Sequence, residues 1–215
     1  ELQHAFGRID ATTGLPNRSQ FAEDLADLSR EAPGGQHVAV FVELLDAQQT
    51  STVQRVMGQA ALDNLSRQGA RHLSAALPAG ATVYQLGVCQ YIYRCVVASE
   101  SEAAEQALQL RRELLGLAQD NNPPISLRPA LGIVPFAPTQ VDATDLLRSS
   151  HSACLDARAT ESGVGLFSVS VDAGHQRRFT LISDIRRALS AEDQLRLAFQ
   201  PRVDTQSGAC VGAEA

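Results

Sequence analysis

The chain has 215 residues, of which 44% are hydrophobic and 20% are charged, as in a globular domain that can bury a core. Its net charge of −6 argues against broad nucleic-acid binding, which depends on clustered positive charge, and no apolar run is long enough to span a membrane. All eighteen basic residues are arginine, which excludes chemistry that requires a lysine, such as a Walker-A phosphate site or a Schiff base.

The first expected elements are two helices and a strand. Apolar residues at helical spacing over residues 2–9 indicate the tail of a helix that enters from an upstream domain. A turn-rich stretch at 12–18 leads into a second helix, which the Pro-Gly-Gly sequence at 33–35 ends. The apolar and β-branched run at 37–45 predicts a buried strand.

The middle of the chain predicts a long helix followed by a hairpin. Apolar residues keep helical phase over residues 51–77, and the Pro-Ala-Gly sequence at 78–80 ends that pattern. Two strands are expected at 82–86 and 90–97. Gly87 begins the tight turn between them, so these strands are predicted to form a hairpin.

Helices and strands then alternate. Ser99 and Glu102 have the spacing of a capping box, and Asp142 is placed to cap a later helix. The elements expected after the hairpin are a helix, a strand, a helix and a strand, at 101–119, 125–134, 142–158 and 163–169. This order around a central hairpin predicts an α/β fold, an α+β sandwich in which helices pack on a central mixed sheet.

The sequence changes character near residue 173. A short linker at 172–175 is expected to precede a helix at 175–190, and strands at 195–203 and 209–213 follow. These strands form a hairpin with no core behind it. We therefore expect the last residues to be the opening of a further domain.

The four cysteines, at 89, 95, 154 and 210, show no CxxC spacing and no histidine at a zinc-ligand offset. We expect reduced thiols in a cytoplasmic protein, although a longer parent protein could be anchored in a membrane.

One motif points to a known family. Residues 10–18, with the sequence DATTGLPNR, resemble the D-x-L-T-G-L-P-N-R motif that opens GGDEF domains, with Thr12 in place of the family's leucine. The order of elements over residues 8–171 is also similar to that family. The resemblance implies a nucleotidyl-cyclase-like fold, with residues 1–9 as the tail of an upstream signalling helix and 10–171 as the GGDEF domain.

A second motif lies near the C-terminus. Residues 199–203 (FQPRV) and 212–215 (GAEA) resemble the first hairpin of an EAL domain. Residues 172–215 are therefore expected to be a linker helix and the first hairpin of a truncated EAL barrel. Glu214 is similar to the glutamate that binds metal in intact EAL domains, but it has no partner ligands in this sequence, so no metal is expected there.

The GGDEF signature itself is degenerate. Active members of the family join two GTP molecules across a dimer, with Mg²⁺ held by carboxylate oxygens. The corresponding residues here are Gly87, Val88, Cys89, Gln90 and Tyr91. Val88 adds a branched side chain, Cys89 replaces a metal-binding acid with a poor Mg²⁺ ligand, and Gln90 lacks the charge of a glutamate. We therefore expect no catalytic residue and no bound metal.

Other site positions follow from the resemblance. The remaining metal carboxylate corresponds to Glu43 by strand position or to Asp46 by counting back from Gly58, and both alternatives stay open. Arg158 matches a lysine that touches the triphosphate in the family. The family's RxxD product-inhibition motif would fall at 78–81, where it is absent.

Nucleotide recognition is the other role that the resemblance suggests. Asp63 matches an aspartate that contacts the guanine base, Gln54 falls near an asparagine that binds ribose or base, and Gly87 is the retained signature glycine. The alternative interpretation for Asp63 is an ordinary solvated residue on a long helix.

Three functions follow, in descending order. The first is an inactive GGDEF domain, without cofactor, that relays a signal from an upstream sensor domain to a downstream EAL domain, as a homodimer or with a protein partner. The second is a GTP sensor, binding Mg²⁺ with GTP, that tunes an EAL phosphodiesterase; Val88 opposes it. The third is a residual diguanylate cyclase. An intact parent could carry EAL phosphodiesterase activity.

Overall fold

The computed structural model describes residues 7–31, 34–77, 81–117, 125–191 and 196–214. The chain forms two compact units, residues 1–168 and 169–215, which are described separately. Within the described residues, no helix is both long and apolar enough to cross a lipid bilayer.

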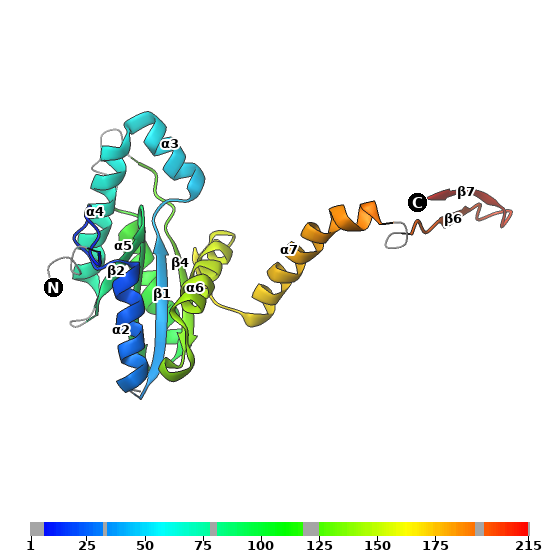
Figure 1. The fold of residues 1–215 in the computed structure, drawn as a ribbon. Coiled ribbons are helices and arrows are strands. Elements are labelled where there is room, and N and C mark those ends of the chain that lie inside the picture. Colours follow the sequence, from blue (N-terminus) through cyan, green and yellow to red (C-terminus); the bar gives the residue numbers. More distant parts are fainter. Residues whose placement is uncertain (1–6, 32–33, 78–80, 118–124, 192–195, 215) are drawn as a thin grey trace. The chain divides into compact units, whose positions relative to one another are not determined.

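The first unit is built on a mixed sheet (Figure 1). In its described part the sheet has five strands in the order β2-β3-β1-β4-β5. The strands are β1 (Gln36–Glu43), β2 (Val83–Gly87), β3 (Gln90–Val97), β4 (Ala130–Phe136) and β5 (Val164–Leu166). β1 is antiparallel to both β3 and β4, whereas β5 runs parallel to β4. The predicted mixed sheet with a central hairpin is confirmed.

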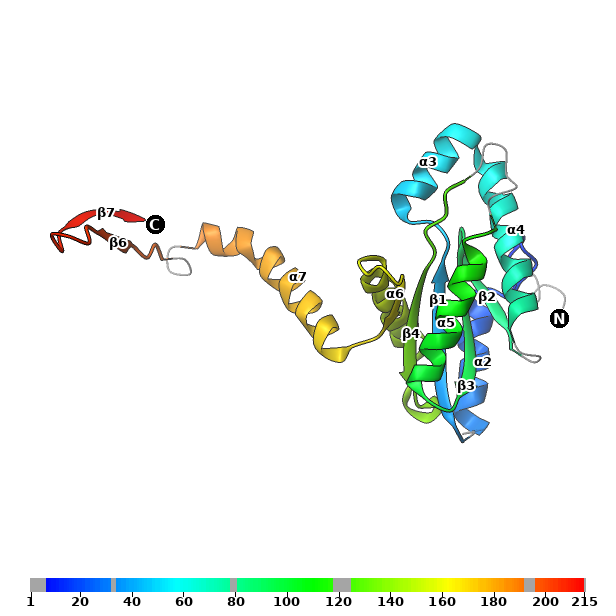
Figure 2. The same cartoon turned by 180° about the vertical axis from the view of Figure 1, so that it is seen from behind.

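Helices cover both faces of this sheet (Figures 1 and 2). They are α2 (Arg18–Glu31), α3 (Ala47–Met57), α4 (Gln59–Ala76), α5 (Glu100–Leu114) and α6 (Ala143–Arg158). Because side chains alternate along a strand, Val38, Val40 and Val42 of β1 pack with apolar residues of α4 and α5. Ala39, on the opposite face, packs with apolar residues of α2 and α6, so β1 is buried on both faces. The predicted α/β sandwich is confirmed.

α6 approaches β4 closely at a glycine. A Cβ at Gly132 would lie 2.3 Å from the backbone nitrogen of Cys154 and 2.4 Å from the carbonyl oxygen of Ser150. Neither backbone atom can move independently of α6. The absence of a side chain at Gly132 therefore sets the distance between the helix and the strand.

The motif at 10–18 folds as a turn that anchors α2 to the sheet. The Asp10 carboxylate accepts hydrogen bonds from the amide and the hydroxyl of Thr13, both at 2.8 Å. Asn17 Oδ1 accepts from the Ser19 amide at 2.9 Å at the start of α2. The Pro16 carbonyl accepts from the amide of Gln85 in β2 at 2.8 Å. Local hydrogen bonding thus explains why this motif is polar and turn-rich.

The helix predicted as continuous over 51–77 is two helices. α3 starts at residue 47, and Gly58 (φ 82°, ψ 176°) separates it from α4. This conformation lies far from the helical region and favours glycine. The prediction was wrong because the apolar spacing stays in phase on both sides of the break.

Other boundaries differ by less. The strand predicted at 125–134 begins only at Ala130, and the helix predicted at 101–119 ends at Leu114. Residues 7–9 are not helical, since Ile9 forms a bridge with Pro16, and residues 1–6 lie outside the described part.

The caps of two helices agree with the sequence. The Ser99 hydroxyl accepts from the Glu102 amide at 3.1 Å, and Asp142 accepts from the Thr144 amide at 2.7 Å. The Glu102 carboxylate, however, accepts from the amide of Ala98, one residue before the expected partner.

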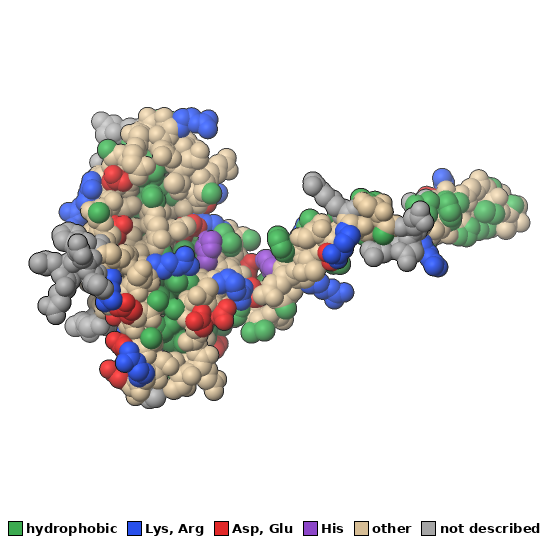
Figure 3. All heavy atoms as spheres, in the orientation of Figure 1, with side chains coloured by type: hydrophobic (Ala, Val, Ile, Leu, Met, Phe, Trp, Pro, Cys, Tyr) green, Lys and Arg blue, Asp and Glu red, His purple; other side chains and the backbone are tan. Residues whose placement is uncertain are grey.

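The second unit contains α7 (Val169–Ser190), β6 (Gln200–Val203) and β7 (Cys210–Glu214). α7 is helical from its first residue, so the linker predicted at 172–175 is instead part of this helix. β6 and β7 pair antiparallel as the predicted hairpin, and the described residues of both strands are exposed. Figure 3 shows hydrophobic side chains on the surface of α7 and of the hairpin.

Candidate functional site

The signature residues form a tight hairpin at one end of the sheet. Val88 and Cys89 join β2 to β3, and Gly87 pairs with Gln90 across the turn. A Cβ at Gly87 would lie 2.8 Å from Gln90 Oε1, so this glycine leaves room for the Gln90 side chain. On its other side Gln90 pairs with Glu43, the last residue of β1. The fold therefore places the signature hairpin beside one of the two candidate metal carboxylates.

Cys89 turns its side chain into the core. Its φ of 56° lies in the left-handed region, which is uncommon for a residue other than glycine, and the residue is fully buried. Its amide donates to Ser66 Oγ on α4 at 3.1 Å, and its sulfur lies 3.4 Å from the same oxygen. Burial is the main cause that raises the pKa of the Cys89 thiol to about 11. Position 89 therefore presents a neutral thiol, directed away from solvent.

Tyr91 serves as a buried connection between the hairpin and α4. Its hydroxyl donates to the Ser66 carbonyl at 2.7 Å. The ring lies against Gly69, where a Cβ would be 2.6 Å from the tyrosine oxygen. Burial raises the pKa of Tyr91, so its hydroxyl remains a donor at neutral pH.

Both carboxylate oxygens of Glu43 are already engaged. Gln90 Nε2 donates to Oε1 at 2.7 Å. Arg158, at the end of α6, donates to Oε2 from Nε at 2.8 Å and from Nη2 at 2.6 Å. The two side chains are 7% and 16% exposed, for Glu43 and Arg158 respectively, so this ion pair is largely shielded from water. A guanidinium and an amide thus occupy the positions around the carboxylate that a cation would need.

Asp46, the other candidate, caps α3. Its carboxylate accepts from the Gln49 amide at 2.7 Å, and the Gln49 side-chain oxygen accepts from the Asp46 amide at 3.2 Å. This reciprocal pair is a capping box, which accounts for an aspartate here without a metal.

These residues do not fit Mg²⁺, a hard cation that prefers several oxygen ligands. Glu43 is bound by two side chains, Cys89 points into the core, and Gln90 directs its amide nitrogen at Glu43. Across the described ranges, no three His, Cys, Asp or Glu side chains gather closely enough to hold a metal ion.

The predicted nucleotide residues Gln54 and Asp63 lie together at the break between α3 and α4. Gln59 connects them: it donates to the Asp63 carboxylate at 2.8 Å, and its own oxygen accepts from Gln54 Nε2 at 3.3 Å. Gln54 and Gln59 are exposed, and Asp63 is half-buried. No hydrogen bond found within the described part of the chain joins this group to Gly87.

Two contacts of the site were not predicted from the sequence. The pairing of Glu43 with Arg158 joins residues that are 115 positions apart, and the contact of Ser66 with Cys89 spans 23 positions. Arg158 was singled out only through its match to a lysine. An acid at a strand end and an arginine at a helix end are common enough to carry no pairing signal.

The remaining predicted positions lie apart from this site. Glu214 is at the end of β7, where Arg202 Nε approaches its carboxylate at 3.7 Å on an exposed hairpin. Positions 78–80 of the expected RxxD motif lie outside the described residues.

Comparisons with known proteins bear on the first unit and on the whole chain. The family described as "Diguanylate cyclase, GGDEF domain" matches residues 8–163. The "Cyclic di-GMP phosphodiesterase PA2567" of Pseudomonas aeruginosa is 29% identical over 209 residues, covering 96% of this chain and 35% of that protein. The "Uncharacterized protein Rv1354c" of Mycobacterium tuberculosis is 28% identical over 210 residues, covering 96% and 33%. The chain thus spans about a third of these relatives.

Solved structures share the fold. The coiled coil and GGDEF domain of DgcB from Caulobacter crescentus, in complex with c-di-GMP, has a TM-score of 0.65 at 14% identity, covering 77% of this chain and 89% of that one. The GGDEF domain of PA2567 from Pseudomonas aeruginosa gives 0.59 at 24% identity, covering 71% and 94%. The diguanylate cyclase SiaD of Pseudomonas aeruginosa, in complex with its activator SiaC, gives 0.64 at 18% identity, covering 78% and 65%.

Proposed function

Because the chain belongs to the GGDEF family of diguanylate cyclase domains, a family of cyclic di-GMP signalling, we propose that it is a catalytically inactive member that acts as a regulatory and interaction module. The observation that carries the proposal is the engagement of Glu43. Gln90 and Arg158 take up both of its carboxylate oxygens. A domain that satisfies this carboxylate internally has no place for the metal that the family's chemistry needs.

Product formation tests this proposal directly. The purified chain is incubated with GTP and either Mg²⁺ or Mn²⁺, beside an active GGDEF domain, and cyclic di-GMP is measured by mass spectrometry. We expect no product above a blank without protein. Product that disappears in a Glu43→Ala variant would overturn the proposal.

Reversal variants measure how far the site has diverged. Val88→Gly, Cys89→Asp and Gln90→Glu restore the family's signature chemistry at three positions. We expect the triple variant to remain inactive, because the Cys89 side chain points toward Ser66 and Leu62 of α4 and Arg158 still binds Glu43. Adding Arg158→Lys tests whether the ion pair is the remaining obstacle.

We further propose that the second unit leads into an EAL domain. The alignment with PA2567 covers 96% of this chain, so it extends past the matched GGDEF residues, and that relative is named a cyclic di-GMP phosphodiesterase. On this proposal α7 connects the inactive domain to a phosphodiesterase or receptor. Reading the gene beyond residue 215, and measuring cyclic di-GMP hydrolysis by its intact product, tests it. A reading frame without an EAL sequence would refute it.

A GTP sensor is the second candidate, and one observation favours it. Gln54, Gln59 and Asp63 form a connected polar group whose ends are the two positions expected to recognise a nucleotide. If this group binds GTP, saturating GTP raises the melting temperature of the chain, and Asp63→Ala removes the increase. An unchanged melting temperature at millimolar GTP with Mg²⁺ would exclude this candidate.

A further inference from the structure

Two adjoining cavities lie on one side of α3, between this helix and residues 125–130. The first has a volume of about 490 Å³ and the second about 330 Å³, and Asp46 and Arg128 line both. None of the signature residues lines either cavity, and neither does Gln54 or Asp63. The cavities are therefore separate from the positions expected to bind a nucleotide base.

The first cavity is mainly apolar. Leu45 and Val53 are buried beneath it, Met57 and Ile125 are half-buried, and Val56 is 71% exposed. An exposed valine beside other apolar side chains in a hollow is surface that an apolar ligand would cover. The volume is within the range of pockets for small molecules.

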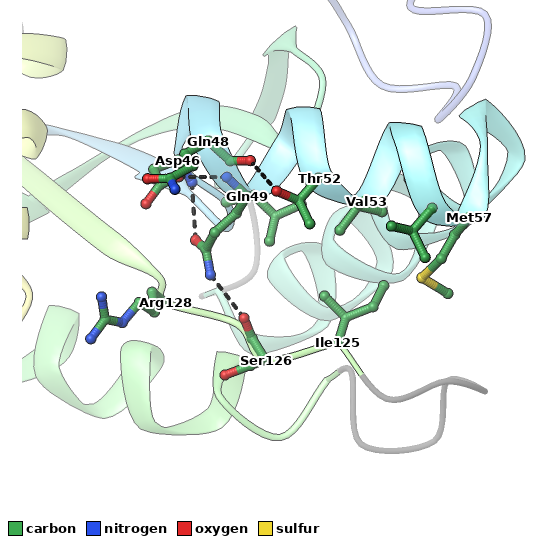
Figure 4. Close-up of a pocket in the computed structure, with 11 residues that line it drawn as sticks. Asp46, Gln48, Gln49, Thr52, Val53, Met57, Ile125, Ser126 and Arg128 are labelled. Atoms are coloured by element: carbon green, nitrogen blue, oxygen red, sulfur yellow. Dashed lines mark hydrogen bonds between the residues drawn. The ribbon is translucent and has the colours of Figure 1, made fainter.

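The walls of this cavity are held apart by Gln49 (Figure 4). Its side-chain nitrogen donates to the Ser126 carbonyl at 2.9 Å, while its oxygen accepts from the Asp46 amide. Thr52 satisfies its hydroxyl on the Gln48 carbonyl at 2.8 Å. Most polar groups of the walls are thus already paired, and the walls keep a fixed spacing that a ligand would not have to impose.

The second cavity brings three guanidinium groups together. Arg158 is committed to Glu43 and to the Arg128 carbonyl. Arg111 donates from Nε to the Pro129 carbonyl at 3.0 Å. The terminal nitrogens of Arg111 and the whole guanidinium of Arg128 have no hydrogen bond or ion pair with a described residue.

The position of Arg111 is prepared by a glycine. A Cβ at Gly163 would lie 2.2 Å from Arg111 Nε, so the guanidinium occupies space that any other residue would fill. Asp46 and Glu161 also line this cavity, and Asp46 accepts from the Gln49 amide. The unpaired donors are therefore those of Arg111 and Arg128, and guanidinium donors bind oxyanions strongly.

We propose that the two cavities together bind a small amphiphilic anion, with an aromatic or aliphatic body in the first and a phosphate or carboxylate group at Arg111 and Arg128. The apolar walls reject a polar body, and the unpaired guanidinium groups at the shared end select an anionic head. This site goes beyond the proposed function, because it requires neither GTP binding nor an EAL domain.

Calorimetry with 1-naphthyl phosphate tests the site in the 215-residue chain. Inorganic phosphate and neutral 1-naphthol each carry half of the proposed recognition. We expect the naphthyl phosphate to bind at least about tenfold more tightly than either, since both halves contribute. Equal binding of inorganic phosphate would show a simple arginine patch, and equal binding of 1-naphthol would show an apolar surface; each result would overturn the proposal.

Variants at exposed positions separate the two halves. Arg128→Gln and Val56→Glu should each weaken 1-naphthyl phosphate at least about tenfold, by loss of a charged donor and by a charge in the apolar cavity. Arg55→Gln, also on α3 but outside both cavities, is the matched control and should change affinity less than about twofold. Both test residues are exposed, so unchanged melting temperatures will show that the fold is intact. Equal effects of Arg128→Gln and Arg55→Gln would place the anion elsewhere.

Discussion

At the scale of single residues, Cys89 links backbone geometry to chemistry. Its left-handed φ directs the sulfur at Ser66, and burial then raises its pKa from 9.0 to about 11. A thiol reagent at pH 8 should modify the exposed Cys210 quickly and Cys89 very slowly, since the thiolate is the reactive form. Mass spectrometry of the labelled peptides checks the order, and Cys210→Ser should remove the fast phase. Rapid labelling of Cys89 in the folded chain would contradict the buried position.

The same shift gives a pH dependence. The folded pKa of Cys89 is raised above the unfolded value, so its contribution to stability is complete below about pH 9 and is lost as the pH rises toward about 11. Urea unfolding at pH 8, 9 and 10 should show a falling free energy of unfolding. Cys89→Ser weakens the loss only if the thiol is its source, which separates Cys89 from the buried tyrosines.

The ion pair of Glu43 and Arg158 predicts an asymmetric mutational effect. Arg158→Gln leaves a carboxylate that is 7% exposed without its charge partner and should destabilise the domain by about 3 kcal/mol. Arg187→Gln, which breaks an exposed pair with Asp184, should cost less than about 0.5 kcal/mol. Adding Glu43→Gln to Arg158→Gln should recover part of the loss. Chemical denaturation measures all three, and equal costs for the two single variants would disprove the buried character of the pair.

The sequence could predict which signature residues are replaced, because that depends only on local order. It could not predict that Cys89 faces the core, since the direction follows from a backbone angle that a cysteine rarely adopts. Nor could it predict that Arg158 neutralises Glu43, because only the folded sheet brings the end of α6 to the end of β1.

At the scale of elements, Gly132 fixes the packing of α6 on β4. Gly132→Ala should destabilise the domain by about 3 kcal/mol, because the new Cβ would overlap backbone atoms of α6. Gly174→Ala is a matched control: it lies within α7 with nothing within 4 Å, and alanine is a better helix former by about 1 kcal/mol. Urea denaturation followed by circular dichroism compares them. A neutral effect of Gly132→Ala would mean that the helix can move away from the strand.

Gly58 tests a conformational rather than a steric requirement. Nothing lies within 4 Å of a Cβ at this position, yet its φ of 82° disfavours any L side chain. Gly58→Ala should therefore cost about 2 kcal/mol through backbone strain alone. If stability instead rises, α3 and α4 have joined into the continuous helix that the apolar spacing predicted.

The strands and helices were mostly predictable because their apolar residues follow one period within each element. The exceptions lie where period and backbone disagree. The break at Gly58 interrupts a helix without shifting the phase of its apolar face. Residues 125–129 look like a strand by composition but pair with no neighbour; Ser126 instead accepts from Gln49 of α3.

At the scale of the whole molecule, the two units should differ in local stability. β1 is buried on both faces and paired along both edges, whereas the described residues of β6 and β7 are exposed and an isolated hairpin is marginally stable. Amide hydrogen exchange should therefore be slowest in β1 and fast, within minutes, over residues 200–214. Protection of the hairpin equal to that of β1 would show that a further surface covers it.

The central position of β1 also has a consequence during synthesis. This strand leaves the ribosome early, but its partners arrive later: Gln36 pairs with Val97 in β3, and His37 pairs with Phe136 in β4. Until residue 136 has emerged, one edge of an apolar strand has no partner, and before residue 97 neither edge has one. A nascent chain in that interval carries an open template for wrong pairing, so its yield in the cell should depend on translation rate and on chaperones that shield such segments.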